Sequence, residues 1–285
     1  MTRQSALPPS AGLGLKPDYY RDALETDVDD IWFEVHPENY MVAGGPRLAW
    51  LDAIRDNHAL SFHGVGASLG GLGPFDAPHL KALKSLIERF EPDQVSEHAT
   101  FSSHQGQYHA DLLPLPRTEE SIAHLSSRVS AFQDAIDRRI LLENPTNYLN
   151  FACECDEPEF LTQVAKRSGC GLLIDLNNIW VSANNIAIDP YDYIRRIAPN
   201  FVGEIHIAGY SSDPILGDSF LIDSHDAPIK STVFNLLEYA LKLWGPKPVL
   251  IERDGNIPEF DILLDERQKA QALIDACMSE RDDAS

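Results

Sequence analysis

Residues 172–176 read LLIDL, a short aliphatic run that closes on an aspartate and a leucine. Runs of this length and composition are typical of strands that are buried on both faces of a sheet. Seven further runs have the same character, and each is followed by a loop and an amphipathic stretch. The eight predicted strands are residues 12–15, 31–36, 60–65, 94–99, 140–144, 172–176, 203–208 and 248–253.

The stretches between these runs carry apolar residues at helical spacing, and several begin with residues that favour a helix N-terminus. Pro46, Pro158 and Pro190 suit early helical positions, and Glu119 and Glu120 place negative charge in a first turn. The predicted helices are residues 17–24, 46–57, 77–90, 118–137, 158–168, 190–197, 229–244 and 259–276.

Alternating strands and helices predict an α/β protein, and eight such units predict a single-domain (β/α)8 barrel of the TIM type. We expect this barrel to occupy residues 12–276, between an N-terminal tail at 1–11 and a C-terminal tail at 277–285. A doubly wound open sheet is the alternative fold. It is disfavoured because it would have fewer strands and a glycine-rich phosphate loop, and no G-x-G-x-x-G or G-x-x-x-x-G-K-[ST] motif follows a predicted strand.

The chain has 285 residues and is strongly acidic, with 44 Asp and Glu against 23 Lys and Arg and a formal net charge of −21. This balance argues against binding to nucleic acid and against a polybasic role at a membrane, because phosphate contacts need clustered Lys and Arg. No run approaches the roughly 18–20 apolar residues of a membrane span, and the first residues lack the apolar core of a secretory signal. We therefore expect a cytoplasmic protein. The cysteines lack the C-x-x-C spacing of zinc sites, so we expect free thiols at Cys153, Cys155, Cys170 and Cys277.

Acidic residues and histidines lie at the C-terminal ends of seven of the eight predicted strands. In a (β/α)8 barrel these ends converge on one face, and that face carries the active site. The side chains should therefore lie close together. They are Glu34, His36, His63, Glu97, His98, Glu143, Asp175, His206 and Glu252.

Imidazole combined with carboxylate suits iron, manganese or zinc, and the absence of nearby thiolates disfavours a structural zinc or an iron–sulfur cluster. The loop after the seventh predicted strand adds Asp223 and His225. Four histidines and four carboxylates exceed what one ion with open positions can use, and the carboxylates would repel one another without cations. The sequence therefore predicts a metal centre of two or three ions, at the C-terminal ends of the strands. The candidate ligands are His63, His98, Glu143, Asp175, His206, Asp223, His225 and Glu252.

Other polar residues near the strand ends have alternative roles. Asn178 is a further candidate ligand through its amide oxygen, or a hydrogen-bonding support for the ligands. Glu34, His36, Glu97 and Asn144 are expected to orient ligands or to face a substrate. The remaining histidines lie on predicted helices or loops, and we expect them at the solvated surface; they are His58, His79, His104, His109 and His124.

Nine ordered blocks of sequence resemble one known family: WFEVHPENYM (32–41), SFHGVGASLGG (61–71), VSEHATF (95–101), LLPLPRTEE (112–120), RRILLENPTNYL (138–149), GLLIDLNNIWVSA (171–183), GEIHIAGY (203–210), LIDSH (221–225) and LIERDGNIPE (250–259). The family is that of the multinuclear non-haem iron-dependent oxidative enzymes (MNIO), which includes the methanobactin biosynthesis oxidase. The resemblance runs from Gly12 to Ile274. Within the family, the sequence of these blocks looks closest to the bufferin-type branch, whose members modify small copper-binding peptides.

This resemblance implies a barrel that holds two to three Fe ions in a mixed Fe(II)/Fe(III) state and uses O2 as co-substrate. The eight candidate ligands match the positions of the family's ligands, with Asn178 as a possible ninth. The family acts on cysteine residues of ribosomally made precursor peptides, with help from a separate partner protein that binds the leader. In the bufferin-type branch the expected product is a thiooxazole, whereas other branches make oxazolone–thioamide groups or excise a cysteine carbon. Residues 101–117, with Tyr108, are expected to cover the site or hold the peptide, or to form a plain surface loop.

Two other classes of function fit parts of the sequence. A metal-dependent hydrolase or isomerase could use a similar barrel, as the trinuclear-zinc apurinic endonucleases and the sugar isomerases do. The net charge counts against a DNA substrate, and no predicted strand ends in a Lys that could act as an isomerase base. A non-enzymatic role in metal storage is disfavoured because a ligand-rich site on the active face of this fold is more often catalytic.

Overall fold

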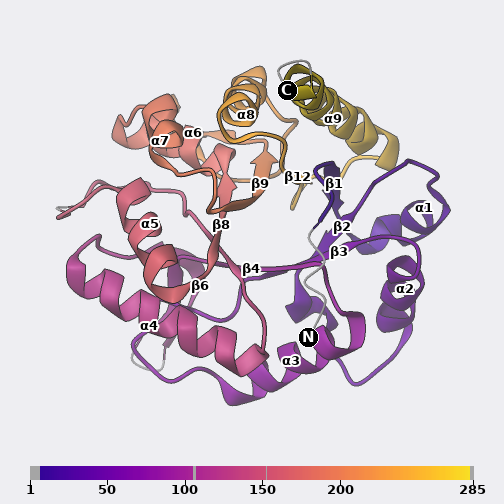
Figure 1. The fold of residues 1–285 in the computed structure, drawn as a ribbon, viewed down its shortest axis with the longest axis horizontal. Coiled ribbons are helices and arrows are strands. Elements are labelled where there is room, and N and C mark those ends of the chain that lie inside the picture. The colour runs from indigo at the N-terminus through magenta and orange to yellow at the C-terminus, as the bar shows by residue number, and fades with distance from the viewer. Residues whose placement is uncertain (1–6, 105–106, 152, 283–285) are drawn as a thin grey trace.

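Eight parallel strands close into a barrel in the computed structural model, which describes residues 7–104, 107–151 and 153–282 (Figure 1). Around the barrel the strands follow the order β1-β12-β9-β8-β7-β4-β3-β2, and β1 closes the ring by pairing Leu13 with both Phe33 and Ile251. The predicted single-domain (β/α)8 barrel is therefore confirmed. Its strands are β1 (Ala11–Gly14), β2 (Phe33–Val35), β3 (Leu60–Gly64), β4 (Gln94–His98), β7 (Leu141–Glu143), β8 (Gly171–Asp175), β9 (Val202–Ala208) and β12 (Val249–Glu252).

Helices surround the barrel and pack their apolar faces against it (Figure 1). Side-chain caps begin several of them: Thr118 accepts from the backbone N–H of Ser121, and Asp156 accepts from that of Glu159. No helix within the described residues is long and apolar enough to cross a membrane. The outer helices are α1 (Tyr20–Glu25), α2 (Pro46–Arg55), α3 (Ala77–Phe90), α4 (Glu119–Ile136), α5 (Glu157–Ser168), α7 (Pro190–Arg196), α8 (Ser231–Trp244) and α9 (Phe260–Asp282).

The helices differ from the predicted ones in three places. Helix α6 (Leu176–Ile186) was not predicted; it begins directly after β8, where the side chain of Asp175 accepts from the backbone N–H of Asn178. Helix α9 ends at Asp282 rather than at residue 276, and Cys277 on it is buried. The predicted helix 17–24 is a 3₁₀ turn, Pro17–Tyr19, followed by α1.

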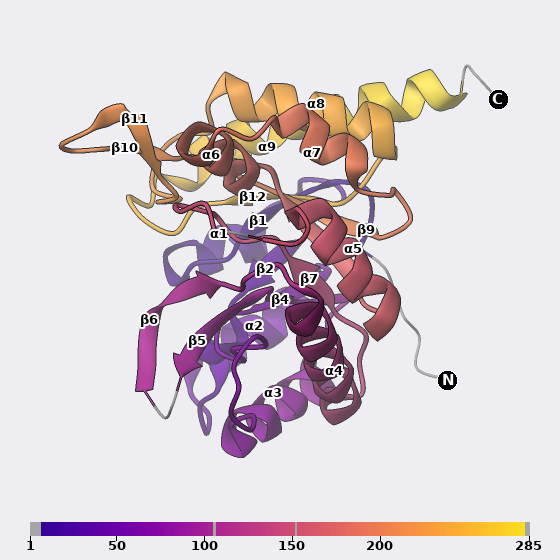
Figure 2. The same ribbon diagram turned by 90° about the vertical axis from the view of Figure 1, so that its left-hand side faces the viewer.

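Two antiparallel hairpins follow barrel strands at their C-terminal ends. The first, after β4, pairs β5 (Thr100–His104) with β6 (Gln107–Pro114), and the second, after β9, pairs β10 (Ser211–Asp213) with β11 (Gly217–Ile222). Figure 2 shows both hairpins projecting on the same side of the barrel. Most of segment 101–117 is thus a hairpin beside the mouth of the barrel.

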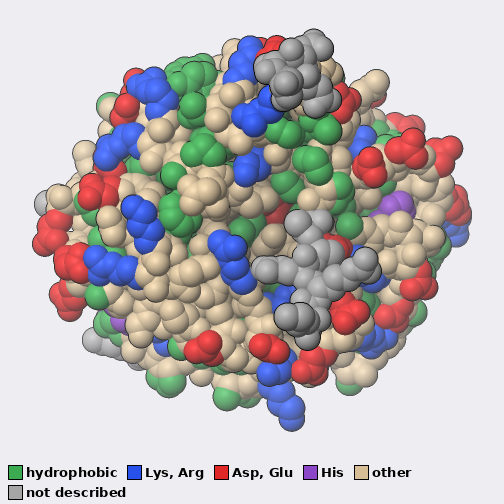
Figure 3. Space-filling view, viewed as in Figure 1, with side chains coloured by type: hydrophobic (Ala, Val, Ile, Leu, Met, Phe, Trp, Pro, Cys, Tyr) green, Lys and Arg blue, Asp and Glu red, His purple; other side chains and the backbone are tan. Residues whose placement is uncertain are grey.

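The two ends of the barrel differ in polarity. At the N-terminal end of the strands, Trp32 packs with Leu7 and Leu250, and its ring lies so close to Gly12 that a Cβ there would overlap it. Figure 3 shows the surface on this side, where Lys and Arg side chains are scattered among apolar and uncharged ones. Toward the C-terminal end the buried side chains include many ionisable groups, so the chemistry is concentrated at that end; they are Glu34, His63, Glu97, His98, Glu143, Asp175, Glu204, His206 and Glu252.

Candidate metal centre

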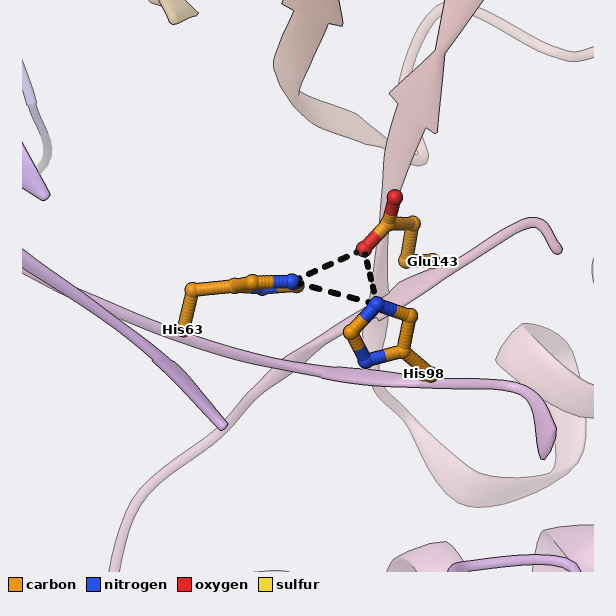
Figure 4. Close-up of side chains that lie close together, drawn as sticks. All are labelled: His63, His98 and Glu143. Carbon is orange, nitrogen blue, oxygen red and sulfur yellow. Dashed lines mark hydrogen bonds and ion pairs between the residues drawn. The ribbon is translucent and has the colours of Figure 1, made fainter. Parts of the chain in front are cut away.

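Three of the candidate ligands meet at one point, brought there by the ends of β3, β4 and β7. Nε2 of His63 lies 3.1 Å and Nε2 of His98 lies 3.2 Å from Oε2 of Glu143, and the two nitrogens are 3.3 Å apart. Figure 4 shows the three side chains pointing toward one another. All three are buried. Donor atoms bound at about 2.0–2.2 Å to one ion stand roughly 3 Å apart, so this spacing suits a shared metal ion.

Four carboxylate and imidazole groups form a second cluster beside the first. Asp175 at the end of β8 lies with Glu143 and His206, and the ligand atoms of these three are all within 4.8 Å of one another. Nδ1 of His206 lies 3.3 Å from Oε2 of Glu252 at the end of β12. Glu143 therefore belongs to both clusters, as a carboxylate does when it bridges two ions.

A third group lies in the loop between β11 and α8. Nε2 of His225 is 2.7 Å from Oδ1 of Asp223, and the other oxygen of Asp223 is 2.8 Å from the hydroxyl of Thr146. That hydroxyl is also 2.7 Å from the amide oxygen of Asn178. A side chain at Gly209, directly after β9, would overlap the backbone of this loop, so the glycine lets the loop pack against the strand. Asn178, which the sequence indicated as a further candidate ligand, is thus linked to Asp223 through the hydroxyl of Thr146.

A cavity of about 470 Å³ opens above these groups. His63, His98 and Glu143 line it, whereas Asp175 and His206 lie beneath it. One wall is formed by β6, which contributes Tyr108, Ala110, Asp111 and Leu112. The cavity is therefore reached past the β5–β6 hairpin.

The first cluster is strongly polarised in the metal-free protein. Burial lowers the pKa of His98, but the negative charges of Glu143 and Glu97 outweigh burial and raise that pKa to about 9. Burial raises the pKa of Glu143, but His98 and His63 outweigh it and hold that pKa at about 2. His98 therefore carries a proton at neutral pH in the absence of metal, and a metal ion would have to displace this proton.

Negative charge is in excess deeper in the site. Burial, opposed by His225 and reinforced by Glu143, raises the pKa of Asp175 well above its ordinary value. Burial and the charge of Glu34 raise the pKa of Glu204 to about 8. Acids in this environment hold protons at neutral pH unless cations replace them, so the charge balance of the site suits bound metal ions.

The donor atoms fit a set of iron, manganese or zinc ions. Oδ2 of Asp175 is buried and has no hydrogen-bond partner among the described residues, while Oε2 of Glu143 and Nδ1 of His206 are buried and face other candidate ligands. Buried polar atoms without partners are costly, and a metal ion would satisfy all three. The cysteines do not line the cavity, so the donors are nitrogen and oxygen, which suit these three metals.

Three further candidates, Glu97, Asn144 and His36, make hydrogen bonds to the backbone around the ligands. The two oxygens of Glu97 accept from the backbone N–H groups of Ala67 and His98, at 2.6 Å each. Asn144 bonds through both its amide atoms to the backbone of Asp175. His36 lines the cavity and its Nδ1 is 3.1 Å from the carbonyl oxygen of His63.

The expectation for the other histidines was wrong for most of them. His104 is exposed, but the other four are partly buried. His58 packs edge-on against Phe33, and Nε2 of His79 is 3.2 Å from a carboxylate oxygen of Glu38. Nε2 of His124 is 3.1 Å from the carbonyl oxygen of Gly71. Imidazole has an apolar body and two polar atoms, so at the edge of the barrel it covers apolar surface while it bonds to nearby loops.

Sequence reasoning missed four residues at the site. Glu204 carried a signal, because it precedes His206 by two and strand alternation places both inside the barrel. Asp254 likewise follows Glu252 by two; its Oδ2 lies 3.5 Å from Nδ1 of His225 and its Oδ1 lies 2.6 Å from Nζ of Lys16. Thr146 and Glu38 carried no comparable signal; Glu38 bonds to the backbone N–H groups of Val65 and Gly66.

The fold is shared with enzyme barrels of low sequence identity. A D-psicose 3-epimerase from Clostridium cellulolyticum superposes with a TM-score of 0.57 at 12% identity, over 95% of this chain and 98% of that one. Endonuclease IV from Thermus thermophilus superposes with a TM-score of 0.55 at 13% identity, over 95% of this chain and 100% of that one. At such identity the likeness concerns the fold alone.

Relatives of high identity cover more than nine-tenths of the chain. A UPF0276 protein of Caulobacter vibrioides is 47% identical over 277 residues, which are 97% of this chain and 99% of that protein. A UPF0276 protein of Bordetella bronchiseptica is 45% identical over 270 residues, 94% of this chain and 93% of that one. A family model described as "RiPP precursor modification enzyme MbnB/TglH/ChrH" matches residues 10–275. It confirms the family resemblance seen in the sequence, and the chain therefore belongs to the MbnB/TglH/ChrH family of RiPP precursor modification enzymes.

Proposed function

We propose that this enzyme is a multinuclear iron-dependent oxidase that uses O2 to modify cysteine residues of a ribosomally synthesised precursor peptide. Family membership gives the class of substrate, a RiPP precursor. The observation that carries the proposal is the convergence of His63, His98 and Glu143 on one point, with buried ligand atoms of Asp175 and His206 directly beside it. Nitrogen and oxygen donors without thiolates are typical of non-haem iron sites.

Three groups of residues would hold the ions. His63, His98 and Glu143 would bind one ion, because their donor atoms already lie 3.1–3.3 Å apart. A second ion would share Glu143, and the donor atoms around it come from three further strands; its ligands would be Glu143, Asp175, His206 and Glu252. A third would lie at the loop that carries Asp223 and His225, with the amide oxygen of Asn178 nearby.

When bound, iron would supply a Lewis acid for the cysteine thiolate and the electrons for reduction of O2. The chain positions the peptide and keeps charges in place. The cavity above the ligands admits a side chain between β6 and the loop that carries Ser224 and His225. Burial of Asp175 and His206 below the cavity excludes water from that side.

For the product we propose the bufferin-type thiooxazole. This conversion joins the Cβ of cysteine to the carbonyl oxygen of the preceding residue and removes four hydrogen atoms, which one O2 takes up as two water molecules. The nine blocks of sequence, taken together, support this branch, since within the family they look closest to it.

We also propose that a separate partner protein binds the leader of the peptide and docks beside the hairpins. Large apolar side chains are exposed on loops that follow barrel strands, and such side chains are enriched where proteins associate. They include Leu72 at 73% exposure, Leu149 at 67% and Ile215 at 90%. These loops surround the cavity, so a partner bound there would deliver the peptide to it.

The test begins with metal analysis of protein purified without oxygen, combined with Mössbauer spectroscopy. We expect two or more irons per chain, some of them coupled, and O2-dependent loss of four hydrogens from a cysteine-rich peptide encoded beside this gene. His206→Ala should abolish this conversion, whereas His124→Ala, away from the cavity, should retain it. Stoichiometric zinc that persists after iron supplementation, with no O2-dependent product, would instead favour a hydrolase or isomerase.

A further inference from the structure

Beneath the cavity, two buried carboxylates that the ligand set does not explain lie beside the candidate ligand His206. Glu204 and His206 are two residues apart on β9, so both point into the barrel, and Glu34 reaches them from β2. Strands β2 and β9 are not neighbours in the sheet, which means that Glu34 crosses the barrel interior. His206 and Glu204 are fully buried, and Glu34 is 4% exposed.

The two nitrogens of His206 face different partners. Nδ1 is directed toward the proposed ligands and lies 3.3 Å from Oε2 of Glu252. Nε2 lies 3.4 Å from Oε1 of Glu34 and 3.4 Å from Oε1 of Glu204. A neutral imidazole has one N–H and one free lone pair, so the side that faces an acceptor determines which nitrogen can bind a metal.

Glu34 is itself held in place. The hydroxyl of Ser61 on β3 donates to its Oε2 at 2.8 Å, which leaves Oε1 turned toward His206. Glu204 has no such support: among the described residues no hydroxyl or amide group donates to its oxygens, and its Oε1 faces Nε2 of His206. A buried carboxylate of this kind lowers stability, and an apolar side chain of similar size would avoid that cost.

We propose that Glu34 and Glu204 are positioning residues that accept the Nε2–H of His206 and so keep the lone pair of Nδ1 directed at the metal centre. The inference rests on the ligand role proposed for His206. An imidazole ring whose N–H is held by an acceptor is fixed in tautomer and in orientation. Its other nitrogen is then a better donor to a metal ion. The buried carboxylate of Glu204 then serves metal binding at the expense of fold stability.

Cobalt binding to the metal-free full-length chain tests this without peptide or O2. Glu204→Leu should weaken binding of the Co²⁺ ion that His206 holds about 10–100-fold and alter its visible absorption, as is usual when the support of a ligand is removed. Glu204→Gln, whose amide oxygen can still accept from Nε2–H, should bind within a few-fold of the wild type. The Tm of metal-free Glu204→Leu should equal or exceed that of the wild type, which separates positioning from support of the fold. Glu157→Gln, a buried glutamate outside the cavity, is the matched control and should bind cobalt normally.

Two results would overturn the proposal. Wild-type cobalt affinity and spectrum in Glu204→Leu would show that Glu204 does not support His206. Loss of one whole equivalent of Co²⁺, with the affinity of the remainder unchanged, would show that the carboxylates bind an ion themselves.

If the Glu204→Leu variant does not fold, a measurement on the wild-type protein still tests the proposal. In zinc-loaded wild type, nitrogen-15 NMR should find the proton of His206 on Nε2, and a proton on Nδ1 would contradict the proposal. All of these readouts concern metal binding alone, so they remain informative if the proposed reaction on peptide is not observed.

Discussion

The hydroxyl of Thr146 lies 2.8 Å from Oδ2 of Asp223. The same hydroxyl is 2.7 Å from the amide oxygen of Asn178, and both of these neighbours are acceptors. A hydroxyl has one proton and can donate to only one of them at a time. The remaining short oxygen–oxygen contact would be relieved by a cation shared by Asp223 and Asn178, so Thr146 holds the outer part of the site together.

Thr146→Val removes this hydroxyl with little change in volume, and it should cost about one metal ion per chain. The reason is that Asp223 and Asn178 lose the group that fixes their spacing. Elemental analysis after reconstitution measures the loss. Thr162→Val is the control, since the hydroxyl of Thr162 lies on α5 and has no hydrogen-bond partner among the described residues, and it should keep the full content. An unchanged metal content in Thr146→Val would remove Thr146 from the site.

Glu143→Gln should have a larger effect, because Glu143 belongs to two clusters. An amide supplies one neutral oxygen where the carboxylate can bridge two ions, so we expect less than one tightly bound ion per chain. Glu97→Gln is a matched comparison: its carboxylate bonds to backbone N–H groups rather than facing the cavity, and it should retain most of the metal. Equal losses in the two variants would contradict the shared role of Glu143.

The barrel and the polar ends of its strands could be predicted because both are local patterns. A run such as LLIDL at 172–176 identifies a buried strand by composition, and an ionisable residue at its end needs no knowledge of distant contacts. The positions of His63, His98 and Glu143 at strand ends are enough to predict that they share one face of the barrel, and they do converge.

What could not be predicted depends on contacts across the barrel or on unusual local sequence. Glu34 meets Glu204 and His206 from a strand that is not adjacent to β9, and no local pattern encodes that crossing. Helix α6 was missed because it begins without a turn at the end of β8 and contains four asparagines, which are poor helix formers. The start of α6 depends on the N-cap at Asp175. In the sequence, the place of Asp175 at a strand end indicates a metal ligand and gives no sign of a helix cap.

The metal-free protein should lose stability as the pH rises from 6 to 9.5. The pKa of His98 is raised from 6.5 to about 9 and that of Glu204 from 4.5 to about 8. Each group binds its proton more tightly in the folded chain than in the unfolded chain. Its contribution to stability is therefore fully present below its pKa in the unfolded chain, and it is lost as the pH rises through its pKa in the folded chain. Shifts of this size are worth on the order of a few kcal/mol, and a chain of this length changes its Tm by about 2 °C per kcal/mol.

A Tm lower by roughly 5 °C at pH 9.5 than at pH 6 is the expected result by calorimetry. The metal-loaded protein should show a smaller decrease, because a metal ion has already replaced the proton of His98. A Tm that increases with pH in the metal-free protein would show that these groups do not hold the protons assigned to them.

Tyr108 offers a test of how the peptide reaches the metal centre. It lies on β6 with its side chain 71% exposed, and it lines the cavity together with Ala110 and Leu112. An exposed tyrosine on the wall of a peptide-binding cavity gains contacts when the peptide arrives, and removal of such an aromatic side chain typically costs about 1–2 kcal/mol of binding. Tyr108→Ala should therefore raise KM for the peptide about 5–30-fold and leave kcat within about twofold, since these contacts are the same before and during the reaction. Tyr191→Ala, on α7 away from the cavity, should leave both constants unchanged. A fall in kcat at constant KM would instead place Tyr108 in the chemistry of the bound peptide, which its place on an exposed hairpin, away from the buried strand ends, does not favour.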